Sequence, residues 1–465
     1  MPFISTRLVL FQLLTVVLAA AEAPAPLMVS AARMKPDDPW LEYPTRDLGR
    51  LTGYVTHHDG ELSIYGGLKS RTRPATGFFR TEKIDARWWL IDPEGHPFIN
   101  VGVVDVHIQP GSAAVNENLR ARFGTTAAWA AATTEFLRAH GFNGTGAWSD
   151  DAVLRAVPRP VAYTRIWNFM SAYGQRRGGT YQQPGHTGYP KDCIFVFDPE
   201  FEPFCDDYAK QLESTKDDPW LLGHFSDNEL PFYRRSLDNF LSLPAGDAGR
   251  KAAENWLAEW RTAHPETKTI TDEMRQAFLG FVTERYLRIT TTAIRKHDPH
   301  HLCLGPRFTG QALESSALFA ACARYLDVIA VNYYHAWTPD PALMKRWTEA
   351  SERPFLVTEW YAKAMDSGYA NTTGAGFLVK TQRDRALYYQ NFTLGLLKSG
   401  ACVGWHWFKY MDNDPADLTV DPSNRDSNKG IVTLKFEPYA PLVDGMTELN
   451  QQVYSLVEFF DQRAK

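Results

Sequence analysis

The sequence predicts an α/β protein, a (β/α)8 TIM barrel with a small N-terminal β-rich extension. Eight short runs that are apolar at nearly every position recur along the chain, and helix-like segments separate them. Continuous apolar runs are typical of strands buried on both faces, and their alternation with helices implies parallel βα units. Over residues 97–414 the units average about 40 residues each, as such a barrel requires. A doubly wound sheet is the alternative, but it predicts a glycine-rich phosphate loop, and the sequence contains no GxGxxG or GxxxxGK motif.

The eight predicted strands are FINVGVVDV (98–106), FNGTGAW (142–148), VAYTRIW (161–167), WLLGHFSDNE (220–229), LCLGPRF (302–308), VIAVNYYH (328–335), FLVTEW (355–360) and CVGWHWF (402–408). The segments between them, such as AAWAAATTEFLRAHG and TQRDRALYYQNFTLGLLKSG, have helical composition. The longest insertions follow the third and fourth strands, at about 168–219 and 230–275. In a barrel they lie on the face that holds the active site, where we expect them to wall a groove.

The N-terminal region divides into a leader and an extension. Arg7 precedes an apolar run over 8–20 and a group of alanines, which is typical of a secretory signal peptide. We predict a signal peptide over 1–21, a linker and β-rich cap over 22–96, and the catalytic barrel over 97–465. The apolar run is too short for a comfortable membrane span, so we expect a secreted or periplasmic protein with no membrane partner after cleavage.

Composition excludes several classes of function. The net charge is -5, which provides no basic field for nucleic acid, so we expect no nucleic-acid partner. Aromatic residues reach 13%, which suits either a tryptophan-rich core or sugar stacking. The five cysteines are too few for a disulfide scaffold, although Cys193 and Cys205 lie close enough in sequence to pair. No zinc-ligand spacing is present, and we predict no metal and no cofactor.

Two carboxylates end predicted strands. Glu229 ends the fourth strand and Glu359 ends the seventh, 130 positions later, and three barrel units account for nearly all of this separation. We expect the two side chains to face each other across the barrel mouth at about 5 Å, the separation typical of a retaining glycosidase pair. We predict Glu229 as the acid/base and Glu359 as the nucleophile. Asn228, beside Glu229, is expected to bind the sugar 2-hydroxyl.

The sequence also resembles a known group of enzymes. An Asn-Glu pair on strand four and a Glu ending strand seven is the arrangement of the glycosidase clan A barrels. More narrowly, the stretches ATGFFRTEKIDARWWLIDPEGHPF, GHFSDNELPF, AIRKHDPHHLCLGPRF and CVGWHWFKYMD resemble the family 50 β-agarases. The resemblance spans most of 75–455 and implies a secreted retaining glycosidase acting on a β-linked galactan. The chain departs from the family at VTEWYAKAMDSG, where members carry a Glu-Phe-His type sequence, and it has no room for their large N-terminal sandwich.

Further candidate residues lie at the other predicted strand ends. The resemblance implies that Arg307 steadies the nucleophile, that a tyrosine after strand six touches it, and that a tryptophan after strand eight floors the central subsite. The complete set of predicted substrate-binding residues is Asn228, Asp105, His107, Trp148, Arg307, Tyr333, Tyr334, His335, Trp405 and Trp407. Because strand side chains alternate, we expect Trp405 or Trp407, or both, to face the mouth. We interpret the acidic stretch 411–426 as a solvated loop.

Other functions remain open from sequence alone. The same mechanism on a β-glucan or β-mannan would require the same two carboxylates. A carbohydrate-binding pseudoenzyme would bind without turnover, and a polysaccharide lyase would leave an unsaturated sugar.

Overall fold

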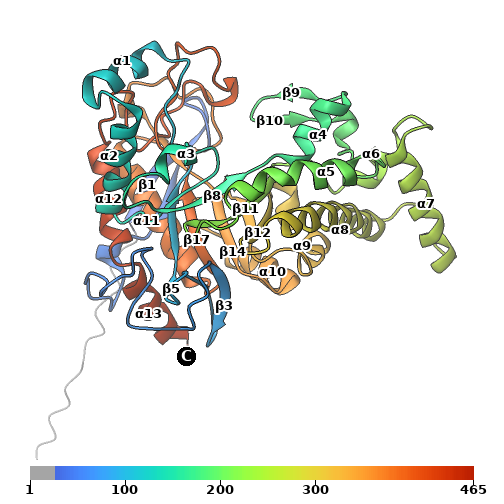
Figure 1. Cartoon of the computed structure of the whole chain (residues 1–465), viewed down its shortest axis with the longest axis horizontal. Coiled ribbons are helices and arrows are strands. Elements are labelled where there is room, and N and C mark those ends of the chain that lie inside the picture. The colour runs from blue at the N-terminus through green and yellow to red at the C-terminus, as the bar shows by residue number, and fades with distance from the viewer. Residues whose placement is uncertain (1–26, 465) are drawn as a thin grey trace, which may run out of the picture.

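A closed eight-stranded parallel barrel forms the body of the protein, as described by a computed structural model that covers residues 27–464 (Figure 1). The predicted signal peptide lies outside the described residues. The barrel strands are β6 (Asn100–Val103), β7 (Gly144–Thr145), β8 (Ala162–Ile166), β11 (Leu221–Asn228), β12 (Leu302–Arg307), β13 (Ile329–Asn332), β14 (Phe355–Glu359) and β17 (Cys402–Trp407). Phe308 closes the barrel between β12 and β13, because its backbone N–H donates to Ala330 O at 2.9 Å. The predicted fold class is therefore confirmed, and each strand lies within its predicted run.

Helices cover the outside of the barrel, and others extend its loops. They are α1 (Ala113–Arg122), α2 (Thr126–Ala139), α3 (Asp151–Leu154), α4 (Phe169–Arg177), α5 (Phe201–Ala209), α6 (Ser236–Leu241), α7 (Ala248–Ala263), α8 (Asp272–His297), α9 (Ser316–Cys322), α10 (Pro341–Ser351), α11 (Gln382–Lys398), α12 (Ala440–Asn450) and α13 (Val453–Ala464). The side chain of Thr381 caps α11 by accepting from Asp384 N. In Figure 1, α7 projects from the body of the molecule. No helix among the described residues is both long enough and apolar enough to cross a bilayer.

A small antiparallel sheet covers the amino end of the barrel. It contains β3 (Arg80–Ile84), β4 (Arg87–Ile91) and β5 (Pro97–Phe98), and the turn between the last two has Gly95 at φ +93°. Leu90 and Phe98 are buried in one cluster with barrel residues such as Leu356. The apolar side chains of this sheet therefore fill the amino end of the barrel.

The N-terminal strand joins a different part of the barrel. β1 (Leu27–Ala32) pairs with β2 (Trp40–Thr45) and with β16 (Phe377–Val379), which pairs in turn with β15 (Ala362–Ala364). The register places Ala31 opposite Val379. We call residues 27–45 the N-terminal strap, because they bind the segment that follows the seventh barrel strand.

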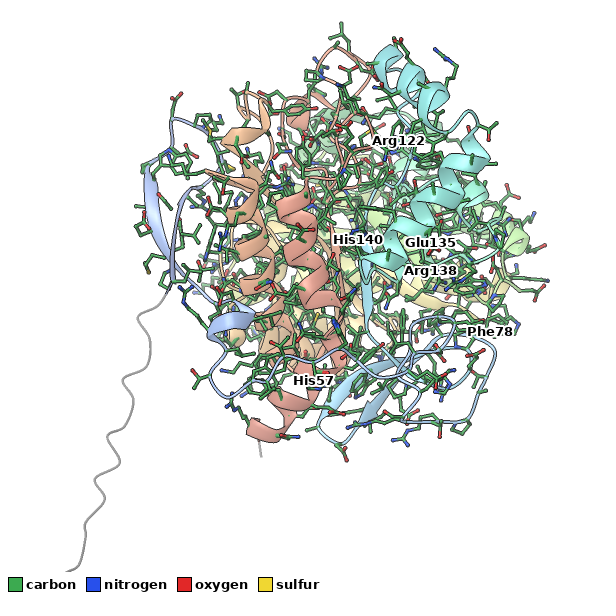
Figure 2. The ribbon with its side chains drawn as sticks, turned by 90° about the vertical axis from the view of Figure 1, so that its left-hand side faces the viewer. His57, Phe78, Arg122, Glu135, Arg138 and His140 are labelled. Carbon is green, nitrogen blue, oxygen red and sulfur yellow. The ribbon has the colours of Figure 1, made fainter. Side chains whose placement is uncertain are left out.

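Hydrogen bonds of Arg138, labelled in Figure 2, fasten the extension to a barrel helix. Arg138 of α2 donates through Nη2 to Ile64 O at 3.2 Å and through Nε to Arg159 O at 3.2 Å. One side chain thus joins α2, the N-terminal extension and the loop before β8.

The first long insertion carries the hairpin of β9 (Tyr181–Gln183) and β10 (His186–Gly188).

All five cysteines are buried free thiols, so Cys193 and Cys205 do not pair in the structure.

Candidate active site

A cavity of about 660 Å³ opens at the carboxyl ends of the barrel strands. It receives side chains from six strand ends and from three loops. The lining includes Asp105, His107, Gln109, Trp148, Gln182, His186, Asn228, Glu229, Tyr334, Glu359, Tyr361, Phe408, Lys409, Asn413, Asp417, Asp421 and Asn424. The structure therefore brings Glu229 and Glu359, which lie 130 positions apart in sequence, into one cavity.

Glu229 follows β11 in a left-handed conformation, with φ +48°. Its backbone N–H donates to Arg307 O at 3.1 Å, which fixes the turn. Asn332 donates through Nδ2 to Glu229 Oε1 at 2.9 Å, and His186 Nδ1 lies 3.9 Å from Oε2. Burial raises the pKa of Glu229. Burial also lowers the pKa of its neighbour His186, which disfavours the cationic form of that imidazole, and the other neighbour, Asn332, is an uncharged amide.

Glu359 ends β14 and has charged and hydroxyl partners. Arg307 Nη1 lies 2.7 Å from Oε1, and the Tyr334 hydroxyl donates to Oε2 at 2.5 Å. Burial raises the pKa of Glu359, Arg307 opposes the rise, and the charge of Glu229 adds to it. A guanidinium and a hydroxyl donor in direct contact both favour the ionised form of Glu359. Glu229 has only the uncharged side chains of Asn332 and Thr309 as donors, and Arg307 acts on it through its charge without a direct ion pair. We therefore expect Glu229 to be protonated and Glu359 to carry the negative charge.

Arg307 connects the two acidic strand ends. It is fully buried at the end of β12, and it donates through Nη1 to Asn228 Oδ1 at 3.0 Å and through Nη2 to Thr358 O at 2.7 Å. Asn332 adds a second bond to Asn228 Oδ1, at 3.2 Å. The Asn228 oxygen is thereby occupied by protein donors, which leaves its NH2 group as the donor for a ligand.

Trp148 forms an aromatic wall of the cavity. Its side chain is 38% exposed, the guanidinium carbon of Arg307 lies 4.5 Å from its ring centroid, and its backbone has φ +62°. A ring with one face on a buried cation and part of its surface open suits stacking against an apolar sugar face.

A second charged group lies across the cavity at Asp105. Lys409 Nζ donates to Asp105 Oδ2 at 2.5 Å, and His107 Nδ1 lies 2.6 Å from Oδ1. Burial opposes ionisation, but Lys409 and His107 together lower the pKa of Asp105. The predicted residues Asp105 and His107 therefore form a unit with Lys409, which was not predicted from the sequence.

Five predicted binding residues do not line the cavity, and one of them, Arg307, contacts Glu359 and Asn228 as described above. On β17 the side-chain direction is opposite to our expectation: His406 Nε2 lies 2.7 Å from Asn100 Oδ1, inside the barrel. Trp405 and Trp407 are fully buried toward the outer layer, donating to Tyr389 Oη at 2.8 Å and to Lys429 O at 2.9 Å. The prediction that they face the mouth was wrong.

Tyr333 and His335 flank Tyr334, which lines the cavity. The Tyr333 ring packs on Trp347 with centroids 5.2 Å apart, and its hydroxyl accepts from Asp340 N at 2.9 Å. His335 is exposed beyond the rim, with φ +64°. Of the three side chains, only that of Tyr334 contacts the Glu359 carboxylate, so the assignment of the other two to substrate binding is corrected.

The acidic stretch 411–426 also differs from our interpretation. Asn413, Asp417, Asp421 and Asn424 from this stretch line the cavity, beside His186 from the β9–β10 hairpin. Tyr361, two residues after Glu359, was also missed. Loop residues that close over a distant strand end carry no local signal in the sequence.

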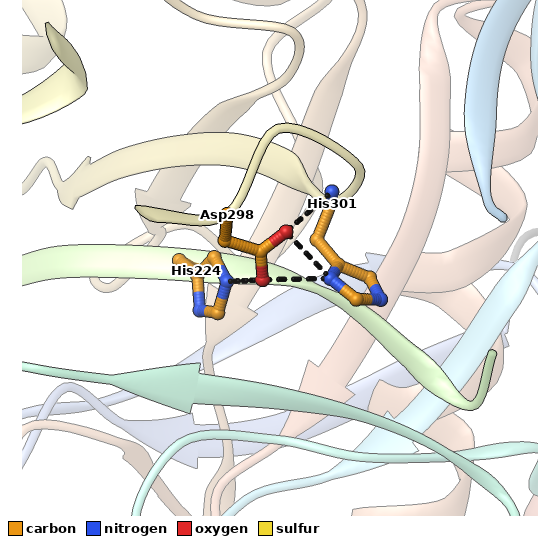
Figure 3. Close-up of side chains that lie close together, drawn as sticks. All are labelled: His224, Asp298 and His301. Carbon is orange, nitrogen blue, oxygen red and sulfur yellow. Dashed lines mark hydrogen bonds and ion pairs between the residues drawn. The ribbon is translucent and has the colours of Figure 1, made fainter. Parts of the chain in front are cut away.

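The described residues include one group with metal-ligand chemistry, His224, Asp298 and His301, buried behind β11 (Figure 3). The Trp167 indole donates to His224 Nδ1 at 2.9 Å, so the proton of His224 is on Nε2, 2.8 Å from Asp298 Oδ2. His301 faces Asp298 through Nδ1 at 2.8 Å and Asp218 O through Nε2 at 2.9 Å, so both of its nitrogens donate. Every ligand atom is used in a hydrogen bond, and the arrangement fits an ion pair that fastens α8 to the barrel, not a metal centre.

The sequence is similar to those of two proteins named as β-agarases. No protein-family model matches the chain. Beta-agarase B of Vibrio sp. (strain JT0107) is 25% identical over 85% of this chain and 50% of its own length, and Beta-agarase A of the same strain is 24% identical over 85% and 48%. The chain thus spans about half the length of these two relatives.

Structural similarity covers more of the related chain. The protein in the crystal structure of BpGH50 superposes with a TM-score of 0.82 at 29% identity, covering 94% of this chain and 96% of that one. The chain resembles the family 50 β-agarases. The agarase AgWH50C shares the fold, with a TM-score of 0.69 at 21% identity over 86% of this chain and 67% of that one. The predicted resemblance is confirmed, and the chain has a family 50-like fold.

Proposed function

We propose that the protein is a glycoside hydrolase that cleaves a β-linked galactan of the agarose type by double displacement. The observation that carries the proposal is the pairing of Glu229 and Glu359 in one cavity, with a neutral donor on the first and a guanidinium on the second. Two carboxyls in such different surroundings suit an acid and a nucleophile.

In the first step, a Glu359 oxygen attacks the anomeric carbon while the bond to the leaving oxygen breaks, and Glu229 gives its proton to that oxygen. The product is a covalent glycosyl ester on Glu359, with Glu229 ionised. In the second step, Glu229 takes a proton from water, the hydroxyl oxygen bonds to the anomeric carbon, and the ester bond breaks. Both carboxyls return to their starting states.

The surrounding residues support these steps. Arg307 and Tyr334 hold the ionised Glu359 and orient its oxygens. The Asn228 NH2 group is available for the sugar 2-hydroxyl, an interaction that strengthens in the transition state. Trp148 supplies a stacking surface.

The substrate class rests on the relatives, which are named β-agarases. A β-glucan or β-mannan would use the same carboxylates and is the alternative. The predicted signal peptide supports a secreted or periplasmic location, where a polysaccharide partner is found.

Product analysis tests the substrate and the mechanism together. Wild-type protein is incubated with agarose, porphyran, β-glucan and β-mannan, and the anomeric configuration of new reducing ends is followed by NMR. We expect neoagaro-oligosaccharides released with retained β configuration. Products from the glucan or mannan alone would replace the galactan assignment, and an unsaturated, ultraviolet-absorbing product would show a lyase.

Azide rescue tests the two roles. We expect Glu229→Ala and Glu359→Gly each to lose several orders of magnitude in rate. Azide should restore turnover with a β-glycosyl azide from Glu229→Ala, because azide then attacks the covalent intermediate, and an α-glycosyl azide from Glu359→Gly. Binding without turnover, equal in wild type and Glu359→Gln, would show a pseudoenzyme.

A further inference from the structure

Lys363 carries a buried charge that the mechanism above does not use. It lies in β15, four residues after Glu359, and is fully buried. Its Nζ donates to the backbone oxygens of Met34 at 2.5 Å, Thr373 at 2.6 Å, Gly374 at 3.1 Å and Asn371 at 3.4 Å. Burial lowers the pKa of Lys363 to about 8, so the ammonium is its form at neutral pH. A buried ammonium is costly unless its hydrogen bonds are fully made, and here backbone carbonyls make them.

The carbonyls belong to a segment that walls the cavity. Gly374 and Ala375 line the cavity directly. A Cβ on Gly374 would lie 2.5 Å from Tyr361 Oη, so the backbone here is in close contact with that ring. The Tyr361 ring packs edge-on against Tyr334, with centroids 5.7 Å apart, and Tyr334 donates to Glu359. The position of this wall is thus linked to the nucleophile by two aromatic rings.

The carboxylate of Asp426 accepts hydrogen bonds from backbone N–H groups of the same segment. Asp426 accepts from Thr372 N and Thr373 N, each at 2.9 Å, and from the Thr372 hydroxyl at 2.5 Å. The carbonyls of Asn371, Thr373 and Gly374 therefore face a cation, and the N–H groups of Thr372 and Thr373 face an anion. Asp38 and Lys35 of the N-terminal strap complete the charges around Lys363. This arrangement favours a single backbone conformation of residues 371–374, because only in that conformation do both Lys363 and Asp426 form their hydrogen bonds.

We propose that Lys363 is a positioning residue that clamps residues 371–376 and the N-terminal strap together, which makes the strap a structural part of the substrate cavity. Met34 O, just after β1, is the strap's contribution to the clamp, and the pairing of Ala31 with Val379 extends it. The inference rests on the proposed function only in treating this cavity as the substrate site.

Kinetics test the clamp through substrate binding. Lys363→Met keeps the length of the side chain and removes the charge and its donors. We expect KM for agaro-oligosaccharides to rise at least about tenfold, because hydrogen bonds to charged groups are the strong ones, with kcat changed much less. Lys251→Met, at an exposed lysine on α7, is the matched control and should change neither. An unchanged KM in Lys363→Met would overturn the proposal.

Hydrogen exchange and chemical rescue test the clamp without any turnover. In Lys363→Met, the amides of 371–376 and of the N-terminal strap should lose protection while the barrel strands keep theirs. Propylammonium, which replaces the atoms missing in Lys363→Ala, should restore that protection, and propanol should not. Uniform loss of protection across the chain, or no rescue, would show a general packing role and overturn the proposal. If wild type fails to hydrolyse agarose, the proposed function fails, and these two measurements still decide the clamp.

Discussion

Arg307 Nη1 lies 2.7 Å from Glu359 Oε1, and neither side chain is open to bulk solvent, with 0% and 7% of their surfaces exposed. The pair joins the ends of β12 and β14, and the same guanidinium binds Asn228, next to Glu229. A buried ion pair is costly to break by removing one partner, because the other charge remains in the interior. The geometry of both acidic groups therefore depends on a single side chain.

Arg307→Met should lower both the activity and the free energy of unfolding. We expect the free energy of unfolding to fall by about 3–5 kcal/mol, the usual cost of leaving a buried charge without its partner. Arg307→Lys keeps the charge but loses the planar fork that reaches Asn228 and Thr358, so it should recover stability better than activity. Chemical denaturation and kcat/KM measure the two effects. Full activity in Arg307→Lys would contradict a positioning role for the fork.

Replacement of each carboxyl by its amide should affect stability differently at Glu229 and at Glu359. Glu359→Gln leaves Arg307 without its anion and should destabilise the fold by about 3 kcal/mol or more. Glu229→Gln keeps an amide contact with Asn332 and should leave stability unchanged or raise it. Thermal unfolding at neutral pH measures the contrast, and equal destabilisation of the two variants would contradict our placement of the charge on Glu359.

The pH dependence of stability checks the same assignment. The folded pKa of Glu229 is raised above its ordinary value of 4.5, so the folded chain binds this proton more tightly than the unfolded chain. The contribution is complete below pH 4.5 and is lost as pH rises through the folded pKa. The free energy of unfolding of wild type minus that of Glu229→Gln should therefore decline as pH rises above 4.5. A flat difference would show that burial does not shift this group.

Asp105 and Lys409 should act as one unit in the cavity. Lys409→Met leaves Asp105 with His107 alone, so we expect KM to rise and the fold to lose about 1.5–3 kcal/mol, as for a hydrogen bond between charged groups. Asp105→Asn should behave similarly. The double variant should lose less than the sum of the two single losses, since each removes the same contact. Additive losses in KM would mean that the two residues contact substrate independently.

The barrel was predictable because its signal is local. Each strand is a run of apolar residues that must be buried on both faces, and the separation of Glu229 from Glu359 follows from the length of three units. The direction of side chains along β17 was not predictable in this way. In CVGWHWF almost every position is apolar, so there is no alternation of polar and apolar residues to indicate which side chains face inward. The structure turns His406 to Asn100 and the two tryptophans to the helices.

The missed residues share a different cause. Lys409 pairs with Asp105, 304 positions away, and Lys363 binds Met34 O, 329 positions away. The stretch 411–426 has the composition of a solvated loop, yet Asp412 accepts from Lys429 N and Gly430 N, each at 2.7 Å, and holds the loop over the cavity. Partners at such separation are set by the closed barrel, and a single sequence shows only the polar residues, not the pairs they form.

Trp148 and Trp405 offer a direct test of the corrected site. Trp148 lines the cavity at 38% exposure, whereas Trp405 is fully buried against Tyr389. Trp148→Ala should raise KM for oligosaccharides about tenfold, since aromatic contacts contribute about 0.5–1.5 kcal/mol beyond the area they bury, with little loss of stability. Trp405→Phe should lower the free energy of unfolding by about 1–3 kcal/mol through a cavity and the loss of the hydrogen bond to the Tyr389 hydroxyl, and leave KM unchanged. Isothermal calorimetry with inactive Glu229→Gln as background separates binding from stability. If Trp405→Phe weakened binding as much as Trp148→Ala does, the central sugar would lie against β17 after all, and the side-chain directions described for that strand would be wrong.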